Sequence, residues 1–125
     1  MKDEVGKQQD LKSRTKDFAL CIVRLYSALP KTTEAQVLGK QLLRSGTSVG
    51  AHYREATRSR SDAEFVSKIE GGLQELEEGL YWMELLVEGG IVKADRIKEL
   101  IDEAHELAAI LTACVKNVKG RSKSR

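Results

Sequence analysis

The segment SDAEFVSKIEGGLQELEEGLYWMELLVEGG, residues 61–90, decides the fold that we predict for this chain. It opens with Ser61-Asp62-Ala63-Glu64, a capping box whose serine and glutamate side chains satisfy free backbone N–H groups at a helix start. Its apolar residues then alternate steps of four and three, the spacing of a helix that packs in a bundle: Ile69, Leu73, Leu76, Leu80, Met83 and Val87. Because Gly89-Gly90 favours a helix end, we predict one long helix from the capping box to Gly89.

A helix is also predicted near the start of the chain, from about Ser13 to Leu29. Apolar residues at helical spacing form one face of it: Phe18, Ile22, Leu25 and Leu29. Pro30 ends this helix, because the residue before a proline is pushed out of the helical conformation.

The next helix is predicted to begin with the capping box Thr33-Glu34-Ala35-Gln36 and to end near Arg58. Its middle holds small residues, Ser45-Gly46-Thr47-Ser48-Val49-Gly50-Ala51, and each glycine there costs roughly 1 kcal/mol against alanine. This stretch is either a loop that splits the helix or a turn where another backbone approaches closely. Helix-favouring residues resume at once without a proline, so we favour the continuous helix.

The last helix is predicted from about Ala94 to a stop at Gly120. Its apolar residues repeat the alternation of four and three: Ile97, Ile101, Ala104, Ala108, Leu111, Val115 and Val118. No segment alternates apolar and polar residues as a strand does, and the links near Pro30, Ser59 and Gly89 are short. Short links make successive helices antiparallel, so we predict an all-α, up-down-up-down antiparallel four-helix bundle.

Length and composition limit the protein to one domain with a charged surface. The 125 residues are 41% apolar and 32% charged, and no stretch approaches the roughly 18 apolar residues of a membrane span. The polar start of the chain lacks the apolar core of a secretory signal, so we expect a cytoplasmic protein. We predict a flexible polar segment (1–12), the bundle domain (13–119) and a basic tail (120–125). Cys21 and Cys114 have no paired-cysteine spacing and are expected to be free thiols.

The net charge is only +2, so the distribution of charge carries more information than its sum. In an up-down-up-down bundle, one end collects the start of the first and third helices and the end of the second and fourth. That end gathers Lys12, Arg14, Lys16, Arg54, Arg58, Arg60, Lys68, Lys116, Lys119, Arg121, Lys123 and Arg125, against Asp10, Asp17, Glu55, Asp62 and Glu64.

This basic end is either an ordinary solvated surface or a site for an acidic partner. We predict contact with the backbone of RNA or DNA through Arg14, Lys16, Arg54, Arg58, Arg60, Lys116, Lys119 and Arg121. No aromatic residues are interleaved with these cations, so binding would be directed to phosphates and weakly specific for sequence.

Two further groups of residues suggest contacts. Residues 80–87 are apolar on nearly every side of the helix, whereas a bundle helix needs only one apolar stripe. Their remaining apolar surface must therefore be covered by a further contact. We predict a subunit interface at Tyr81, Trp82 and Leu85, the alternative being a wide core within a monomer. Close helix packing is predicted at Ser45, Gly46, Val49 and Gly50, while Thr47 and Ser48 are expected to bond helix carbonyls rather than a ligand.

The sequence offers little for catalysis, and we predict no catalytic residue, metal or cofactor. A di-iron bundle needs two Glu-x-x-His motifs, whereas the nearest match here is Asp102-x-x-His105 and His52 has no partner at that spacing. Phosphate-binding loops, nucleophile elbows and Cys/His pairs are absent from the sequence.

One string of residues carries a family resemblance. LGKQLLRSGTSVGA (38–51), followed by Glu55-Ala56, Ser61, Phe65, the acidic run 75–78 and Tyr81-Trp82, resembles a bacterial four-helix-bundle family. Its members were first noticed as proteins encoded in intervening sequences of 23S ribosomal RNA genes. The resemblance spans about residues 15–115. This chain departs from the pattern at His52, where asparagine is more frequent, and at Arg54, where alanine is common.

The resemblance implies a four-helix fold and a continuous second helix. From related accessory proteins of diversity-generating retroelements it implies a homopentamer that binds nucleic acid and a reverse transcriptase. We therefore expect a non-catalytic homo-oligomer that binds nucleic acid, or a nucleic-acid-handling partner, through its basic end. The alternative is a structural or regulatory protein–protein interaction module that makes no contact with nucleic acid.

Overall fold

Helices that alternate in direction make up the computed structural model, which describes the backbone of residues 2–124 and the side chains of residues 11–121. They are α1 (Lys2–Ala28), α2 (Thr33–Thr57), α3 (Asp62–Glu88) and α4 (Ala94–Ser124). Each helix packs against the one before it, and α4 also meets α1. Across the described chain α1 does not contact α3 and α2 does not contact α4, so these pairs lie on diagonals. The predicted all-α antiparallel four-helix bundle is confirmed.

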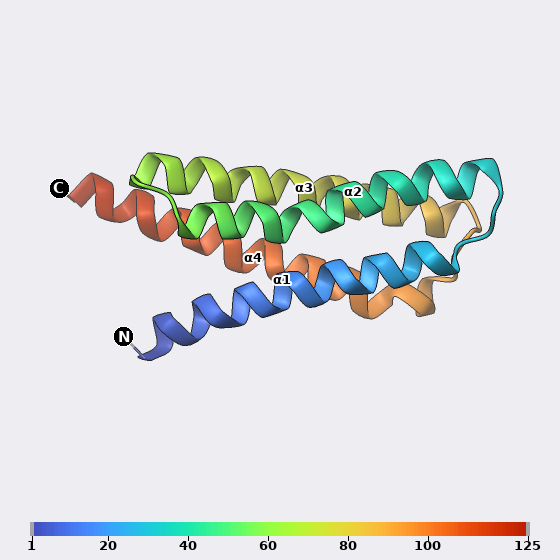
Figure 1. The fold of residues 1–125 in the computed structure, drawn as a ribbon, viewed down its shortest axis with the longest axis horizontal. Helices are drawn as coiled ribbons and strands as arrows, with labels where there is room; N and C mark the ends of the chain where they lie inside the picture. Colours follow the sequence, from blue (N-terminus) through green and yellow to red (C-terminus); the bar gives the residue numbers. More distant parts are fainter. Residues whose placement is uncertain (1, 125) are drawn as a thin grey trace.

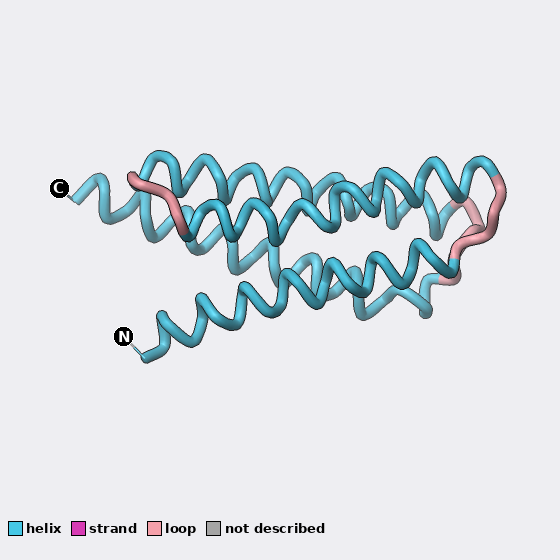
Figure 2. Tube along the Cα trace, in the orientation of Figure 1, coloured by secondary structure: helices cyan, strands magenta, loops and turns pink. Residues whose placement is uncertain are grey.

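The connections divide the bundle into two ends. Figure 1 shows both chain termini at the same end as the link between α2 and α3. Figure 2 shows the links between α1 and α2 and between α3 and α4 together at the opposite end. We call these the terminal end and the loop end.

Local capping explains where the inner helices begin and end. Ser61 is the N-cap of α3, as predicted, and its hydroxyl accepts a hydrogen bond from the Glu64 N–H at 3.1 Å. The N-cap of α2 is Thr32, one residue before the predicted box, and it accepts from the Ala35 N–H at 3.3 Å. Gln36 turns instead to the Pro30 carbonyl oxygen, to which it donates at 2.8 Å.

Two predicted helix boundaries are wrong because both outer helices are longer. Helix α1 begins at Lys2 rather than Ser13, since the first residues are mostly Lys, Glu, Asp and Gln with no proline to stop a helix. Helix α4 passes through Gly120 to Ser124, because one glycine costs roughly 1 kcal/mol and does not by itself end a helix. The basic residues Lys123 and Arg125 lie outside the residues whose side chains are described.

Buried apolar side chains from all four helices form one continuous core. Most predicted face residues belong to it, and the largest fully buried members are Ile22, Leu42, Ile69, Leu76, Met83, Leu86, Leu107 and Leu111. Leu86 and Leu107 were not among the predicted positions. Six predicted face residues are only partly buried: Leu25, Leu73, Leu80, Val87, Ile101 and Ala108.

Candidate functional site

The small residues of α2 bring its neighbours close on both sides. A Cβ built on Gly46 would overlap the side chain of Ile22 in α1, and one on Gly50 would lie 3.1 Å from the Thr15 hydroxyl oxygen. On the α3 side, Gly79 lies against the hydroxyl of Ser45, and Gly72 lies against the backbone carbonyl oxygen of Val49. Helix α2 is continuous through this stretch, as predicted.

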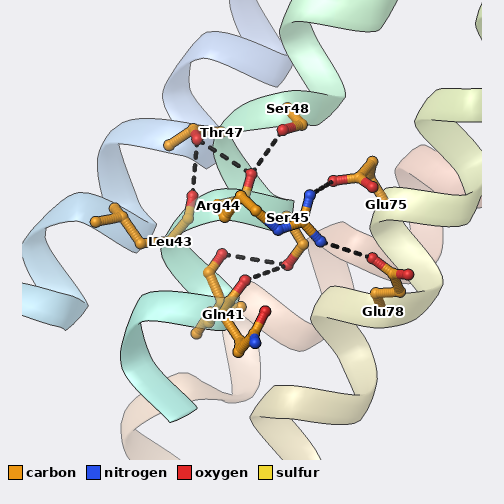
Figure 3. Close-up of polar contacts among 9 residues, drawn as sticks. Gln41, Leu43, Arg44, Ser45, Thr47, Ser48, Glu75 and Glu78 are labelled. Carbon is orange, nitrogen blue, oxygen red and sulfur yellow. Dashed lines mark hydrogen bonds and ion pairs between the residues drawn. The ribbon is translucent and has the colours of Figure 1, made fainter. Parts of the chain in front are cut away.

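Figure 3 shows how the hydroxyl groups of this stretch are used. Ser45 donates to the Gln41 carbonyl oxygen at 3.0 Å, Thr47 to that of Leu43 at 2.7 Å, and Ser48 to that of Arg44 at 2.7 Å. Each bond reaches back four residues within α2, as hydroxyls in helix interiors commonly do. The hydroxyl groups of Thr47 and Ser48 therefore donate their hydrogen bonds to backbone carbonyls of α2.

Two arginines tie helices together through glutamates. Arg44 of α2 reaches Glu75 at 3.0 Å and Glu78 at 2.9 Å, both on α3 (Figure 3). Arg14 of α1 binds both carboxylate oxygens of Glu103 on α4, at 2.6 and 3.0 Å. Bidentate arginine–carboxylate pairs of this kind fix geometry as well as charge. We had not predicted the Arg44 contact, although two glutamates three residues apart on one helix face are a signal for it.

The predicted basic residues do not all lie at the terminal end. Because α1 begins at Lys2, Arg14 and Lys16 stand about three turns inside the helix. Thr15 between them packs against Gly50 of α2, eight residues before Arg58. Arg14 is also engaged by Glu103, so the structure places it between α1 and α4 rather than on a free surface.

The other predicted cations differ in whether a carboxylate neutralises them. Lys119 pairs with Glu70 at 3.6 Å, and Lys68 pairs with Glu55 at 3.0 Å. The Lys68 ammonium holds the pKa of Glu55 below its usual value, first by a hydrogen bond and then by its charge. Within the described side chains, no carboxylate pairs with Lys16, Arg54, Arg58, Arg60, Lys116 or Arg121.

Charge is distributed unevenly along the bundle. The half toward the terminal end, residues 11–16, 50–74 and 108–121, holds ten Lys and Arg against four Asp and Glu. The half toward the loop end, residues 17–49 and 75–107, holds seven Lys and Arg against twelve Asp and Glu. A nearly neutral chain is therefore positive in one half and negative in the other, as its sequence predicts.

The predicted interface residues lie together on α3. Tyr81 is 52% exposed, and its ring centroid is 5.1 Å from that of Trp82, which is half-buried like Leu85. The Trp82 Nε1–H is buried without a hydrogen-bond partner. Trp82 follows Glu78 by four residues, so it lies on the face of α3 that Arg44 reaches from α2.

His52 is a notable residue that sequence reasoning left without a role. Its ring lies over Gly71 of α3, and its Nδ1 atom is buried without a hydrogen-bond partner. Among the described residues, no group of three or more His, Cys, Asp or Glu side chains is arranged to hold a metal ion. Over the same residues, no helix combines the length and apolar character needed to cross a membrane.

Comparisons with known proteins agree on one family. Residues 7–113 match the family described as 23S rRNA-intervening sequence protein. A solved structure from Bacteroides thetaiotaomicron, a protein of unknown function from the S23 ribosomal protein family, shares 34% identity with a TM-score of 0.83. The similarity covers 88% of this chain and 98% of that one. No curated protein is significantly similar to the chain.

Proposed function

The chain belongs to the family of 23S rRNA-intervening sequence proteins, and from this premise we propose that it is a non-catalytic, homo-oligomeric protein that binds nucleic acid. Its ligand is the phosphate backbone of RNA or DNA, and the contact surface is the terminal end of the bundle. We define the basic surface as Arg54, Arg58, Arg60, Lys116 and Arg121.

The observation that carries this proposal is the lack of internal neutralisation on the basic surface. None of its five cations pairs with a carboxylate in the part of the chain whose side chains are described, whereas Arg14, Arg44 and Lys68 each do. Arg58, Arg60, Lys116 and Arg121 are exposed. Cations that no carboxylate neutralises can exchange their bound counterions for phosphate oxygens, which drives association with nucleic acid.

The same surface offers little for reading bases. Tyr53, the aromatic residue beside Arg54, is buried in the core. Phe65, near the start of α3, is only partly buried, but no aromatic side chain described at this end is fully exposed. The surface therefore offers little platform on which bases can stack. We therefore propose binding that follows the backbone and depends weakly on sequence.

Self-association strengthens this mode of binding. Each added copy brings another basic surface, and affinity rises steeply with the number of phosphates contacted at once. The family resemblance suggests a homopentamer. The partly exposed Tyr81 region supports self-association in general, without fixing the number of copies.

Filter binding to a structured RNA and to a DNA duplex tests the proposal. We expect affinity to fall roughly a hundredfold or more between about 50 and about 200 mM salt, as five phosphate contacts imply. The variant R58E/R60E should bind at least about tenfold more weakly. The matched control K31E/K40E changes the same charge at the loop end and should bind like the native chain. No salt-sensitive binding at low ionic strength, or equal losses in both variants, overturns the proposal.

A second candidate function is a protein–protein interaction module without nucleic acid. The exposed ring of Tyr81 favours it, because aromatic residues are enriched at protein interfaces. A partner that handles nucleic acid, such as a reverse transcriptase, fits either reading. Recovery of partners from the native host before and after nuclease treatment separates the two, since partners that survive nuclease support this second function.

A further inference from the structure

A groove lies along the first turns of α3, beside the last turns of α4 (Figure 1). Its volume of about 680 Å³ is within the range of small-ligand sites. Ala63, Val66 and Val118 form its apolar wall, and Gly71 widens it because glycine carries no side chain. The groove therefore offers apolar space at the terminal end of the bundle, beside the basic surface rather than on it.

Polar groups around this wall are available to a ligand. Among the described residues, Ser67 donates to no backbone carbonyl, unlike the hydroxyls of α2, and the Gln74 amide has no hydrogen-bond partner. Lys119 of α4 and Glu70 of α3 face each other at 3.6 Å, which is too long for a hydrogen bond. Because both side chains are more than half exposed, their ion pair adds little stability and can open around a third group.

The charges of the groove differ from those around it. Asp62 and Glu70 line the groove against one cation, Lys119, so its interior does not attract a phosphate group. Exposed cations of the basic surface flank it in the sequence: Arg60 before Asp62, and Lys116 and Arg121 on either side of Lys119. A nucleotide at this end would therefore turn its uncharged base into the groove and its phosphates toward these cations.

Guanine presents the edge that Glu70 and Lys119 complement. Its N1–H and N2–H groups are neighbouring donors that one carboxylate can accept together, and its O6 atom is an acceptor for an ammonium group. Among the bases of RNA and DNA, guanine alone places two adjacent donors beside an acceptor on this edge. In a duplex the same edge is paired with cytosine, so only an unpaired guanine can offer it to a protein.

We infer that the groove is a base-binding site for one unpaired guanine of the bound nucleic acid. Glu70 accepts from N1 and N2, Lys119 donates to O6, and the base lies against Val66 and Val118. This inference deepens the proposed function and rests on it. The basic surface supplies most of the affinity, with weak dependence on sequence, and the groove adds a preference at a single nucleotide.

Filter binding of the full chain to four RNA hairpins tests the inference. The hairpins are identical except at one position of the stem, which carries a bulged guanine, a bulged inosine, a bulged adenine or no bulge. We expect the guanine bulge to bind at least about fivefold more tightly than the adenine bulge or the paired hairpin, because one bidentate contact supplies discrimination of that size. Inosine lacks the N2 amine and should fall between guanine and adenine.

Two variants separate base recognition from charge. E70Q frees Lys119 for phosphate, so the adenine-bulged and paired hairpins should bind more tightly, whereas the preference for guanine should disappear. S67L fills the groove without changing its charge and should weaken the guanine preference at an unchanged salt dependence. E77Q, which removes an acid of α3 outside the groove, is the matched control and should keep the preference. Circular dichroism checks that each variant folds.

The possible results distinguish this inference from the function on which it rests. Absence of salt-sensitive binding to every hairpin overturns the proposed function. Salt-sensitive binding that is equal for the guanine and adenine bulges leaves that function standing and overturns the groove as a base site. A guanine preference that E70Q retains overturns the assignment to Glu70.

A free guanine nucleotide carries the same edge, so calorimetric titration with guanosine monophosphate tests the other source of the base. This nucleotide lacks the neighbouring phosphates that the basic surface would hold, and it should bind far more weakly than the guanine-bulged hairpin. Equal affinities for the two ligands would overturn the assignment to a nucleotide within a longer chain.

Discussion

The imidazole ring of His52 on α2 rests directly on Gly71 of α3. A Cβ at position 71 would lie 2.8 Å from the ring Cε1 and 2.9 Å from Nδ1, closer than side chains tolerate. Two adjacent glycines in the middle of a helix each cost about 1 kcal/mol against alanine. The ring explains that cost at position 71, because only glycine leaves room for it.

We predict that the substitution G71A lowers the stability of the native chain but raises the stability of the H52A variant. Alanine gains up to about 1 kcal/mol of helix propensity, but in the native chain the ring must shift, which costs more. Without the ring only the gain remains. Urea unfolding of the four proteins in this double-mutant cycle measures the coupling, expected at roughly 1–2 kcal/mol. Equal effects of G71A in both backgrounds would show that the ring does not restrict this site.

Gly46 and Gly120 should respond in opposite directions when alanine replaces them, one variant losing stability and the other gaining it. G46A should destabilise the bundle by about 1–3 kcal/mol, because its new methyl group overlaps Ile22 and forces α1 away from α2. G120A should instead stabilise α4 by up to about 1 kcal/mol, since nothing lies within 4 Å of the added carbon. Chemical denaturation of both variants checks this. A loss at position 120 as large as that at position 46 would contradict it.

The helices and their inner faces follow from sequence because apolar spacing and caps are local properties. The start of α1 was missed because residues 2–12 carry helix-favouring charges but almost no apolar residue to mark a period. The helix end predicted at Gly120 was wrong because one glycine weakens a helix without ending it. Local signals therefore predict which elements exist better than where the outer helices end.

The candidate site was harder to predict because charge pairing depends on contacts between helices. Arg14 and Lys16 are two residues apart, yet Arg14 is fixed by Glu103 while Lys16 has no carboxylate partner among the described side chains. That difference arises from how α1 meets α4, and these helices are far apart in sequence.

The Arg44 contact predicts a modest but specific loss of stability. R44A leaves Glu75, whose side chain is only 14% exposed, without its cation. Because Arg44 itself is 56% exposed, we expect a loss of no more than about 1 kcal/mol. K40A, one turn earlier on α2 and without an ion pair among the described residues, is the matched control. Urea unfolding should place R44A clearly below K40A, and equal midpoints would mean that the contact adds no stability.

Removing one acid at the terminal end should strengthen nucleic-acid binding. Glu55 holds Lys68 at 3.0 Å, and E55Q releases that ammonium to the basic surface. One more phosphate contact should steepen the dependence of log affinity on log salt by about 0.9 on duplex DNA. E77Q removes an equal charge from the other half of the bundle and should leave the slope unchanged. A slope that responds equally to both variants would mean that net charge, rather than the terminal end, controls binding.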